Sequence, residues 1–193
     1  MSYATRVAAL MAGMLLSVTA RAAETEELKA GVFNPAREAP DFSLRGSDGT
    51  ALTLSRYRGK VVVLGFGYTS CPNVCPVTLA VLAQAHRKLG ALAGQVQVIY
   101  LTVDPERDNT ERLKQYLAAF DPTFVGGTGT AAQMAAVRTS YGVTAEKRGT
   151  GSDYAVAHSS FVYLITREGK LRALMPFGHK ADDYVHDISM LLN

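Results

Sequence analysis

The chain has 193 residues, which is enough for one domain with a sizeable hydrophobic core and short for two. Hydrophobic residues make up 48% and charged residues 19%, as in ordinary globular proteins. The first 22 residues hold two of the 20 basic residues and no acid, so 18 basic and 17 acidic residues remain beyond them. This near-balance gives no support to nucleic acid as a partner.

The first 22 residues have the pattern of an export signal. Arg6 supplies positive charge, residues 7–18 form an uncharged and largely apolar run, and Ala20-Arg21-Ala22 fits a small-x-small cleavage site. The apolar run is shorter than the roughly 20 residues of a spanning helix, which favours cleavage after Ala22 over an uncleaved membrane anchor. The sequence therefore predicts an exported protein, periplasmic if bacterial and soluble after cleavage, in a compartment that permits disulfides.

The first half of the remaining chain indicates a lead-in, a hairpin and a buried strand. Residues 23–39 are polar and without clear periodicity, which favours a flexible lead-in to a domain over residues 40–193. Turn formers between two alternating stretches predict an added N-terminal hairpin over residues 40–54. Residues 61–67 include no polar side chain, as expected of a strand covered on both faces, and a helix is predicted from Val77.

Further along the chain, strands and helices are expected to alternate before a closing strand-turn-strand unit. The predicted strands are residues 95–103, 124–125, 160–166 and 171–175; the predicted helices are one that ends near Phe120 and is capped by Asp108 or Asn109, then residues 131–139 and 182–192; and residues 146–153 are a polar loop. This order predicts a one-domain α/β sandwich with a central mixed sheet.

The two cysteines of the chain, Cys71 and Cys75, lie between the predicted strand at 61–67 and the helix after it. Pro76 is tolerated at a helix start because its missing N–H would be unpaired there. Both sulfurs are therefore expected near a helix N-terminus, where the dipole favours thiolate. Thiolate binds metals and attacks disulfides, so a metal site, a redox pair and a structural disulfide all remain open.

A third ligand would favour a metal site, and the chain has four histidines. His86, His179 and His186 are interpreted as solvated or merely packed side chains, with His86 facing solvent. His158 is expected at the entrance of the strand that follows the polar loop, from which it can project past the sheet edge. Two thiolates and one imidazole form a soft, low-coordinate set suited to Cu(I), and this set is incomplete for structural zinc.

Three motifs follow one another along the chain: Gly67-Tyr68-Thr69-Ser70-Cys71-Pro72-Asn73-Val74-Cys75-Pro76, then Val103-Asp104-Pro105-Glu106-Arg107-Asp108, then His158-Ser159-Ser160-Phe161-Val162-Tyr163-Leu164-Ile165. Together they resemble the Sco/SenC family, thioredoxin-like copper-delivery proteins that help assemble the copper centre of cytochrome c oxidase. The entry Ala39-Pro40-Asp41-Phe42 is also similar to the start of thioredoxin-like and peroxiredoxin-like domains. The resemblance covers most of residues 39–193.

The resemblance implies a thioredoxin-like fold in which Cys71, Cys75 and His158 bind copper, as Cu(I) and also as Cu(II). It implies an acceptor metalloprotein, with cytochrome c oxidase subunit II as the first candidate. Other copper chaperones and thioredoxin-like reductants are further candidate partners. Asp104 and Asp108 match an acidic loop of the family, and we interpret them as structural. Three positions depart from the commonest family pattern: Ser70, Asn73 and Ala157.

Two functions from different classes follow. The first is a copper metallochaperone that delivers copper to a metalloprotein, with oxidation of Cys71 and Cys75 to a disulfide as its switch. The second is a thiol-disulfide oxidoreductase that reduces the cysteines of an acceptor metalloprotein. The CxxxC spacing, in place of the thioredoxin CxxC, and the distant His158 favour the first.

Overall fold

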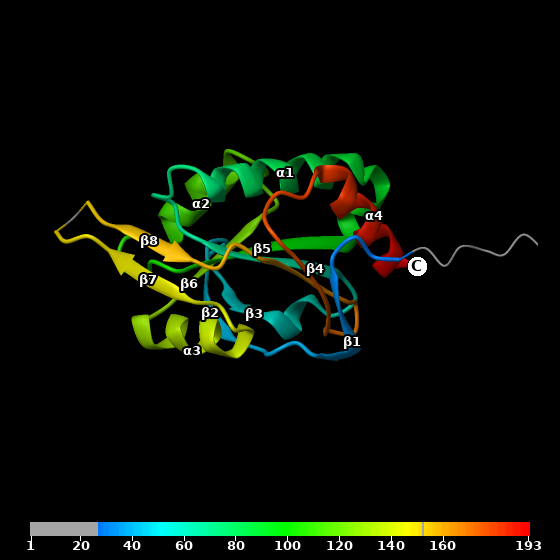
Figure 1. The fold of residues 1–193 in the computed structure, drawn as a ribbon, viewed down its shortest axis with the longest axis horizontal. Helices are drawn as coiled ribbons and strands as arrows, with labels where there is room; N and C mark the ends of the chain where they lie inside the picture. Colours follow the sequence, from blue (N-terminus) through cyan, green and yellow to red (C-terminus); the bar gives the residue numbers. More distant parts are fainter. Residues whose placement is uncertain (1–26, 152) are drawn as a thin grey trace, which may run out of the picture.

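The computed structural model describes residues 27–151 and 153–193. It has a central sheet with helices on both sides (Figure 1). The strands of the eight-stranded sheet are β1 (Gly31–Glu38), β2 (Ser43–Gly46), β3 (Ala51–Thr53), β4 (Val61–Gly67), β5 (Val96–Thr102), β6 (Val125–Thr128), β9 (Val162–Ile165) and β10 (Lys170–Met175). A separate two-stranded sheet contains β7 (Ala145–Arg148) and β8 (Ala155–His158). The helices are α1 (Val74–Lys88), α2 (Thr110–Ala118), α3 (Ala131–Tyr141) and α4 (Ala181–Leu192), with short 3-10 helices η1 (Leu54–Tyr57) and η2 (Gly90–Gln95).

The main sheet is mixed, with strand order β1-β10-β9-β4-β5-β6-β2-β3. Strands β4, β5 and β6 are parallel to one another, and the other pairings are antiparallel. Helices α1, α2 and α4 lie on one side of the sheet and α3 on the other (Figure 1). The predicted α/β sandwich with a mixed sheet is therefore confirmed, and the predicted hairpin is present as β2 and β3.

The hydrophobic core lies on both faces of the central strands. All seven residues of β4 are buried, which explains why this strand has an uninterrupted apolar sequence. Leu79 and Leu82 of α1 belong to the core on one side, and Met134 of α3 belongs to it on the other. Because α1 connects the parallel strands β4 and β5, its N-terminus lies at the carboxyl ends of these strands.

The interpretation of residues 23–39 as a flexible lead-in is wrong for residues 31–38, which form the edge strand β1 beside β10. Six of its eight residues are exposed and the other two half-buried, so the strand has no buried face to produce a hydrophobic alternation. The Pro35 within it is tolerated because an edge strand need not donate at every position. The predicted signal peptide, residues 1–22, lies outside the described residues.

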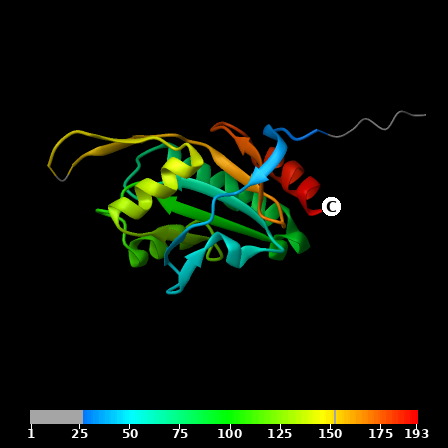
Figure 2. The same cartoon turned by 90° about the horizontal axis from the view of Figure 1, so that it is seen from below.

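The interpretation of residues 146–153 as a polar loop is also wrong in part. Residues 145–148 (β7) and 155–158 (β8) pair as antiparallel strands, which we call the β7–β8 arm. Figure 1 and Figure 2 show the arm projecting from one end of the molecule, away from α4 and the C-terminus. Most of its side chains are exposed, which is why the sequence of this segment resembles a loop.

Within the described part of the chain, no helix combines the length and hydrophobicity needed to cross a membrane.

The start of the described chain is attached to α4 through Asp187. The fully buried carboxylate of Asp187 accepts hydrogen bonds from the backbone N–H groups of Lys29 at 2.7 Å and Ala30 at 2.9 Å.

We expect Asp187→Ala to lower the free energy of unfolding by about 1–3 kcal/mol, because it leaves these backbone donors without their acceptor. Chemical denaturation measures the loss. The matched control is Asp182→Ala in the same helix, where the carboxylate forms an exposed ion pair with Lys88 and is expected to contribute at most about 1 kcal/mol. Equal losses in the two variants would contradict the structural role of Asp187.

Candidate metal site

The turn between β4 and α1 places both cysteines at the N-terminus of the helix. The helix begins at Val74, three residues before the predicted start at Val77, so Cys75 lies in its first turn. Cys71 is partly exposed, and its backbone N–H donates to the carbonyl of Tyr68 at 3.3 Å. One thiol therefore faces the surface while the other, on Cys75, is only 2% exposed.

The two thiols have opposite pKa shifts. Partial burial acts to raise the pKa of Cys71, but hydrogen bonds from the backbone N–H groups of Asn73, Cys75 and Val74 outweigh it and hold the pKa below its usual value. Burial raises the pKa of the Cys75 thiol to about 12. Cys71 is thus the more easily ionised thiol. Cys75 keeps its proton until it binds a metal ion or is oxidised.

His158 is the last residue of β8, and the prediction that it begins the following strand is wrong. Its Nε2 atom lies 3.5 Å from the Sγ atom of Cys75, and its Nδ1 atom lies 2.8 Å from the carbonyl oxygen of Ser159. Donation of an Nδ1 proton to this carbonyl leaves Nε2 as the lone-pair atom that faces the sulfur. Burial lowers the pKa of His158, which favours the neutral, ligating form of the ring.

The structure brings the three predicted residues together. The ligand atoms of Cys71, Cys75 and His158 all lie within 4.8 Å of one another. Across residues 27–151 and 153–193, this is the one group of three or more histidine, cysteine or acidic side chains with that spacing. A thiol-imidazole site of this kind suits a soft metal ion such as Cu(I).

The other histidines pair with carboxylates away from this group, as expected of packed side chains. His179 lies 3.3 Å from Asp183 and His186 lies 2.8 Å from Asp187. The expectation that His86 faces solvent is wrong: its Nδ1 atom lies 2.9 Å from a carboxylate oxygen of Asp121, and its side chain is 13% exposed.

The acidic loop has the structural role that its sequence suggested. Asp108 is fully buried and accepts hydrogen bonds from the N–H of Thr69 at 3.0 Å and from its hydroxyl at 2.5 Å, as well as from the hydroxyl of Thr102 at 2.7 Å. These bonds tie the cysteine-bearing turn to the end of β5. The N-terminal cap of α2 is Asn109, the second of the two predicted candidates.

Two residues of the site have packing roles that the sequence does not predict. Tyr100 on β5 is buried behind the turn, and burial raises its pKa well above the usual value. A Cβ atom on Gly67 would lie 1.7 Å from the Tyr100 hydroxyl oxygen and 2.7 Å from the Cys75 sulfur. Only glycine leaves room for both groups at this point, and neither residue type carries a sequence signal for that arrangement.

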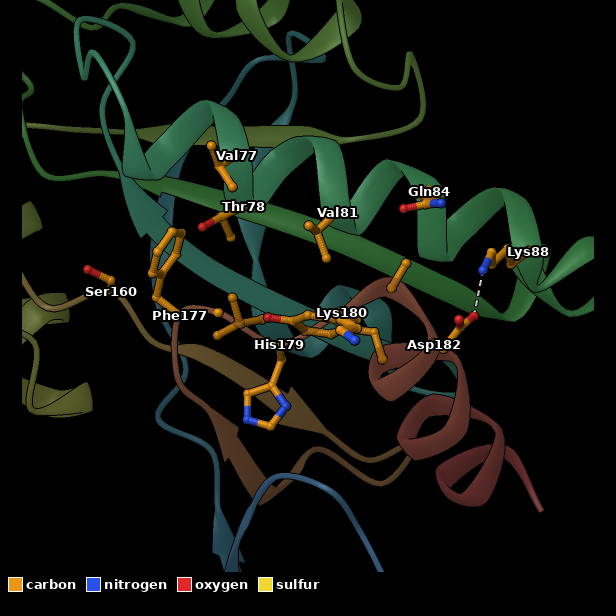
Figure 3. Close-up of a pocket in the computed structure, with 14 residues that line it drawn as sticks. Val77, Thr78, Val81, Gln84, Lys88, Ser160, Phe177, His179, Lys180 and Asp182 are labelled. Carbon is orange, nitrogen blue, oxygen red and sulfur yellow. Dashed lines mark hydrogen bonds and ion pairs between the residues drawn. The ribbon is translucent and has the colours of Figure 1, made fainter.

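A cavity of about 400 Å³ lies next to the site, between α1 and the loop before α4 (Figure 3). Val77, Val81 and Phe177 give it an apolar wall, and the ion pair of Lys88 and Asp182 lies at its far end. A smaller cavity adjoins Cys75 and His158, and the two share lining residues: Thr78, Ser160 and Val162. The surface beside Cys75 and His158 is therefore hollowed and partly apolar.

The fold and the site together define a thioredoxin-like protein with a thiol-imidazole site at the carboxyl ends of its parallel strands. The family model described as SCO1/SenC matches residues 32–193, and the chain therefore belongs to this family. The mitochondrial SCO2 homolog of Bos taurus is 41% identical over 133 residues, which cover 67% of this chain and 50% of that protein. The chain thus spans about half the length of such curated relatives, the SCO2 homologs of Bos taurus and Homo sapiens.

Solved structures agree with this assignment. The structure of Bradyrhizobium japonicum ScoI with copper bound is 35% identical, with a TM-score of 0.75, and the match covers 81% of this chain and all of that one. BsSco, described as a Sco-family cytochrome c oxidase assembly protein with a disulfide switch, is 25% identical with a TM-score of 0.67, over 81% of this chain and 94% of that one. The family and the thioredoxin-like fold are established by these matches.

Proposed function

We propose that this protein binds copper through Cys71, Cys75 and His158 and delivers it to an acceptor metalloprotein. The observation that carries the proposal is the approach of these three donor atoms to within 4.8 Å of one another, although His158 lies 83 positions from Cys75 in the sequence. Two sulfur donors and one imidazole suit Cu(I), whereas structural zinc uses four ligands. The copper-bound ScoI structure supports the same choice of metal.

The burial of the donors suggests an order of events in transfer. Copper binding displaces the proton of the buried Cys75 thiol, whose pKa of about 12 keeps it protonated in the free protein. Cys71 is partly exposed, so an incoming ligand of the acceptor can replace it first. Oxidation of the two copper-bound thiolates by a disulfide of a partner protein, which takes up two electrons and two protons from solution to become a dithiol, forms the Cys71–Cys75 disulfide and releases the metal.

The proposed acceptor is cytochrome c oxidase, through subunit II, in keeping with the description of BsSco as an oxidase assembly protein. Other copper chaperones are proposed as donors of copper to this protein, and thioredoxin-like reductants as donors of electrons to its cysteines. We place the protein in an exported compartment, the periplasm if bacterial, on the pattern of residues 1–22. That pattern supports cleavage after Ala22.

The second candidate function is thiol-disulfide exchange with an acceptor metalloprotein. The observation that favours it is the pairing of a partly exposed cysteine of lowered pKa, Cys71, with a buried one, Cys75. Such a pair has the arrangement of an attacking and a resolving thiol. Turnover in a disulfide-reduction assay that is unaffected by His158→Ala would favour this function over copper delivery.

Copper titration of the reduced protein against a Cu(I) chelator tests the first function. We expect one copper per wild-type chain and, for His158→Ala, an affinity lower by at least about ten-fold, the smallest loss usual for residues that support a metal ligand. The matched control is His179→Ala, where the histidine bonds only to an acidic neighbour on α4, and its affinity is expected to equal that of the wild type. An unchanged affinity for His158→Ala would overturn the assignment of His158.

A further inference from the structure

His158 reaches the cysteines from the β7–β8 arm, whose two strands form a sheet of their own. A ligand on such an arm is positioned only as well as the arm is attached to the body of the protein. Near His158 the arm is attached to the body by the backbone N–H of Val156, which donates to the Tyr68 hydroxyl at 3.2 Å. Hydrogen bonds between Thr144 and Ser159 close the base of the arm. A stronger set of contacts lies at the other end of β8.

That set joins Tyr154, just before β8, to the loop after β5. The hydroxyl of Tyr154 donates to one carboxylate oxygen of Asp104 at 2.6 Å, and the Nε–H of Arg107 donates to the other at 2.5 Å. Arg107 also donates to the backbone carbonyl of Tyr154 at 3.0 Å, and its guanidinium carbon lies 3.7 Å from the centroid of the tyrosine ring. Asp104 is 3% exposed and Tyr154 is 7% exposed, so these charge-assisted bonds are shielded from water.

Both sides of this contact are themselves fixed. Asp104 lies two residues after the end of β5, and its backbone N–H donates to the Thr102 hydroxyl at 2.9 Å. On the side of the arm, the Lys147 ammonium of β7 lies 3.7 Å from the Tyr154 ring centroid and 2.9 Å from a carboxylate oxygen of Glu106. The contact therefore joins the loop after β5 to the arm, both at the residue before β8 and, through Lys147, at β7.

We propose that Tyr154, Asp104 and Arg107 form a latch that positions His158 for copper. The inference rests on the proposed role of His158 as a ligand. Tyr154 precedes His158 by four residues, about 13 Å along an extended strand. A small rotation of the arm about the latch therefore moves the imidazole of His158 along an arc with a radius of about that length. The three latch residues are positioning residues, because they act on copper through His158.

The variant that tests the latch is Tyr154→Phe, which removes the hydroxyl and keeps the aromatic ring beside Arg107 and Lys147. We expect its Cu(I) affinity to fall roughly ten-fold, within the range typical of residues that support a metal ligand. In the His158→Ala background the same change is expected to have no further effect on affinity, because the latch acts only through the imidazole. The matched control is Tyr57→Phe in η1, a buried tyrosine remote from the arm, whose affinity is expected to match the wild type.

A second readout needs no metal. The ring resonances of His158 in the NMR spectrum of the copper-free reduced protein are expected to shift and broaden in Tyr154→Phe and to stay unchanged in Tyr57→Phe. Wild-type affinity together with unchanged His158 resonances in Tyr154→Phe would overturn the latch. A loss of affinity that persists in the His158→Ala background would overturn it as well. Because the NMR comparison is made without copper, it tests the latch even if the wild-type protein fails to bind the metal and the proposed function is wrong.

Discussion

Cys75→Ala is expected to eliminate stoichiometric copper binding. The sulfur of Cys75 lies 3.5 Å from the Nε2 atom of His158, and without it one thiolate and one imidazole remain in the group. A soft monovalent ion held by so few ligands loses more affinity than the roughly 10–100-fold that loss of a supporting residue costs. Titration of the reduced variant with Cu(I) in the presence of a competing chelator measures this loss.

The design must separate loss of a ligand from loss of fold, because Cys75 is also a core side chain. Val81→Ala is the matched control, since it shortens a side chain of the same helix that carries no donor atom. We expect Val81→Ala to bind copper as the wild type does, and both variants to unfold cooperatively in a denaturant titration. Wild-type copper affinity in Cys75→Ala would contradict the proposed site.

Gly67→Ala is expected to produce the largest loss of stability, at least about 3 kcal/mol, the upper end of the usual cost of overpacking a core. The added methyl group would lie 1.7 Å from the Tyr100 hydroxyl oxygen and 2.7 Å from the Cys75 sulfur, within a strand that is buried throughout. Both neighbouring side chains are buried, so neither can rotate away into solvent. Chemical denaturation of the reduced, copper-free protein measures the effect.

The matched control is Gly94→Ala in η2, an exposed glycine where an added methyl group would have no neighbour within 4 Å. Its stability is expected to stay within about 0.5 kcal/mol of the wild type. Adding Tyr100→Phe to Gly67→Ala is expected to restore part of the loss, because it removes the oxygen atom that clashes most severely. Equal stabilities of Gly67→Ala and Gly94→Ala would show that the turn is less tightly packed than described.

The sequence predicted those parts of the fold whose residues are buried in a regular pattern. Residues 61–67 were recognised as a strand because every one of them is buried. By contrast, β1 and the β7–β8 arm were missed because their side chains are mostly exposed, and an exposed strand has no hydrophobic period to detect. Their pairing partners lie in other parts of the chain, and hydrogen bonding between backbones leaves no mark on composition.

For the site, the spacing of Cys71 and Cys75 before a helix predicted two sulfurs near a helix N-terminus and left a metal site, a redox pair and a structural disulfide open. The choice of His158 from four histidines depended on the family resemblance, since its position relative to the cysteines is set by the arm. The support of the site by Tyr100 and Tyr154 was not predicted. A buried tyrosine hydroxyl finds its neighbours through tertiary packing, and the residue type alone does not indicate which they are.

X-ray absorption spectroscopy of the Cu(I)-loaded, reduced protein tests the proposed copper site most directly. We predict two sulfur donors and one nitrogen donor at each copper ion in the wild type, and loss of the nitrogen donor in His158→Ala with both sulfurs retained. Coordination by sulfur alone in the wild type, or a nitrogen donor that persists in His158→Ala, would contradict the assignment of Cys71, Cys75 and His158 as the copper ligands.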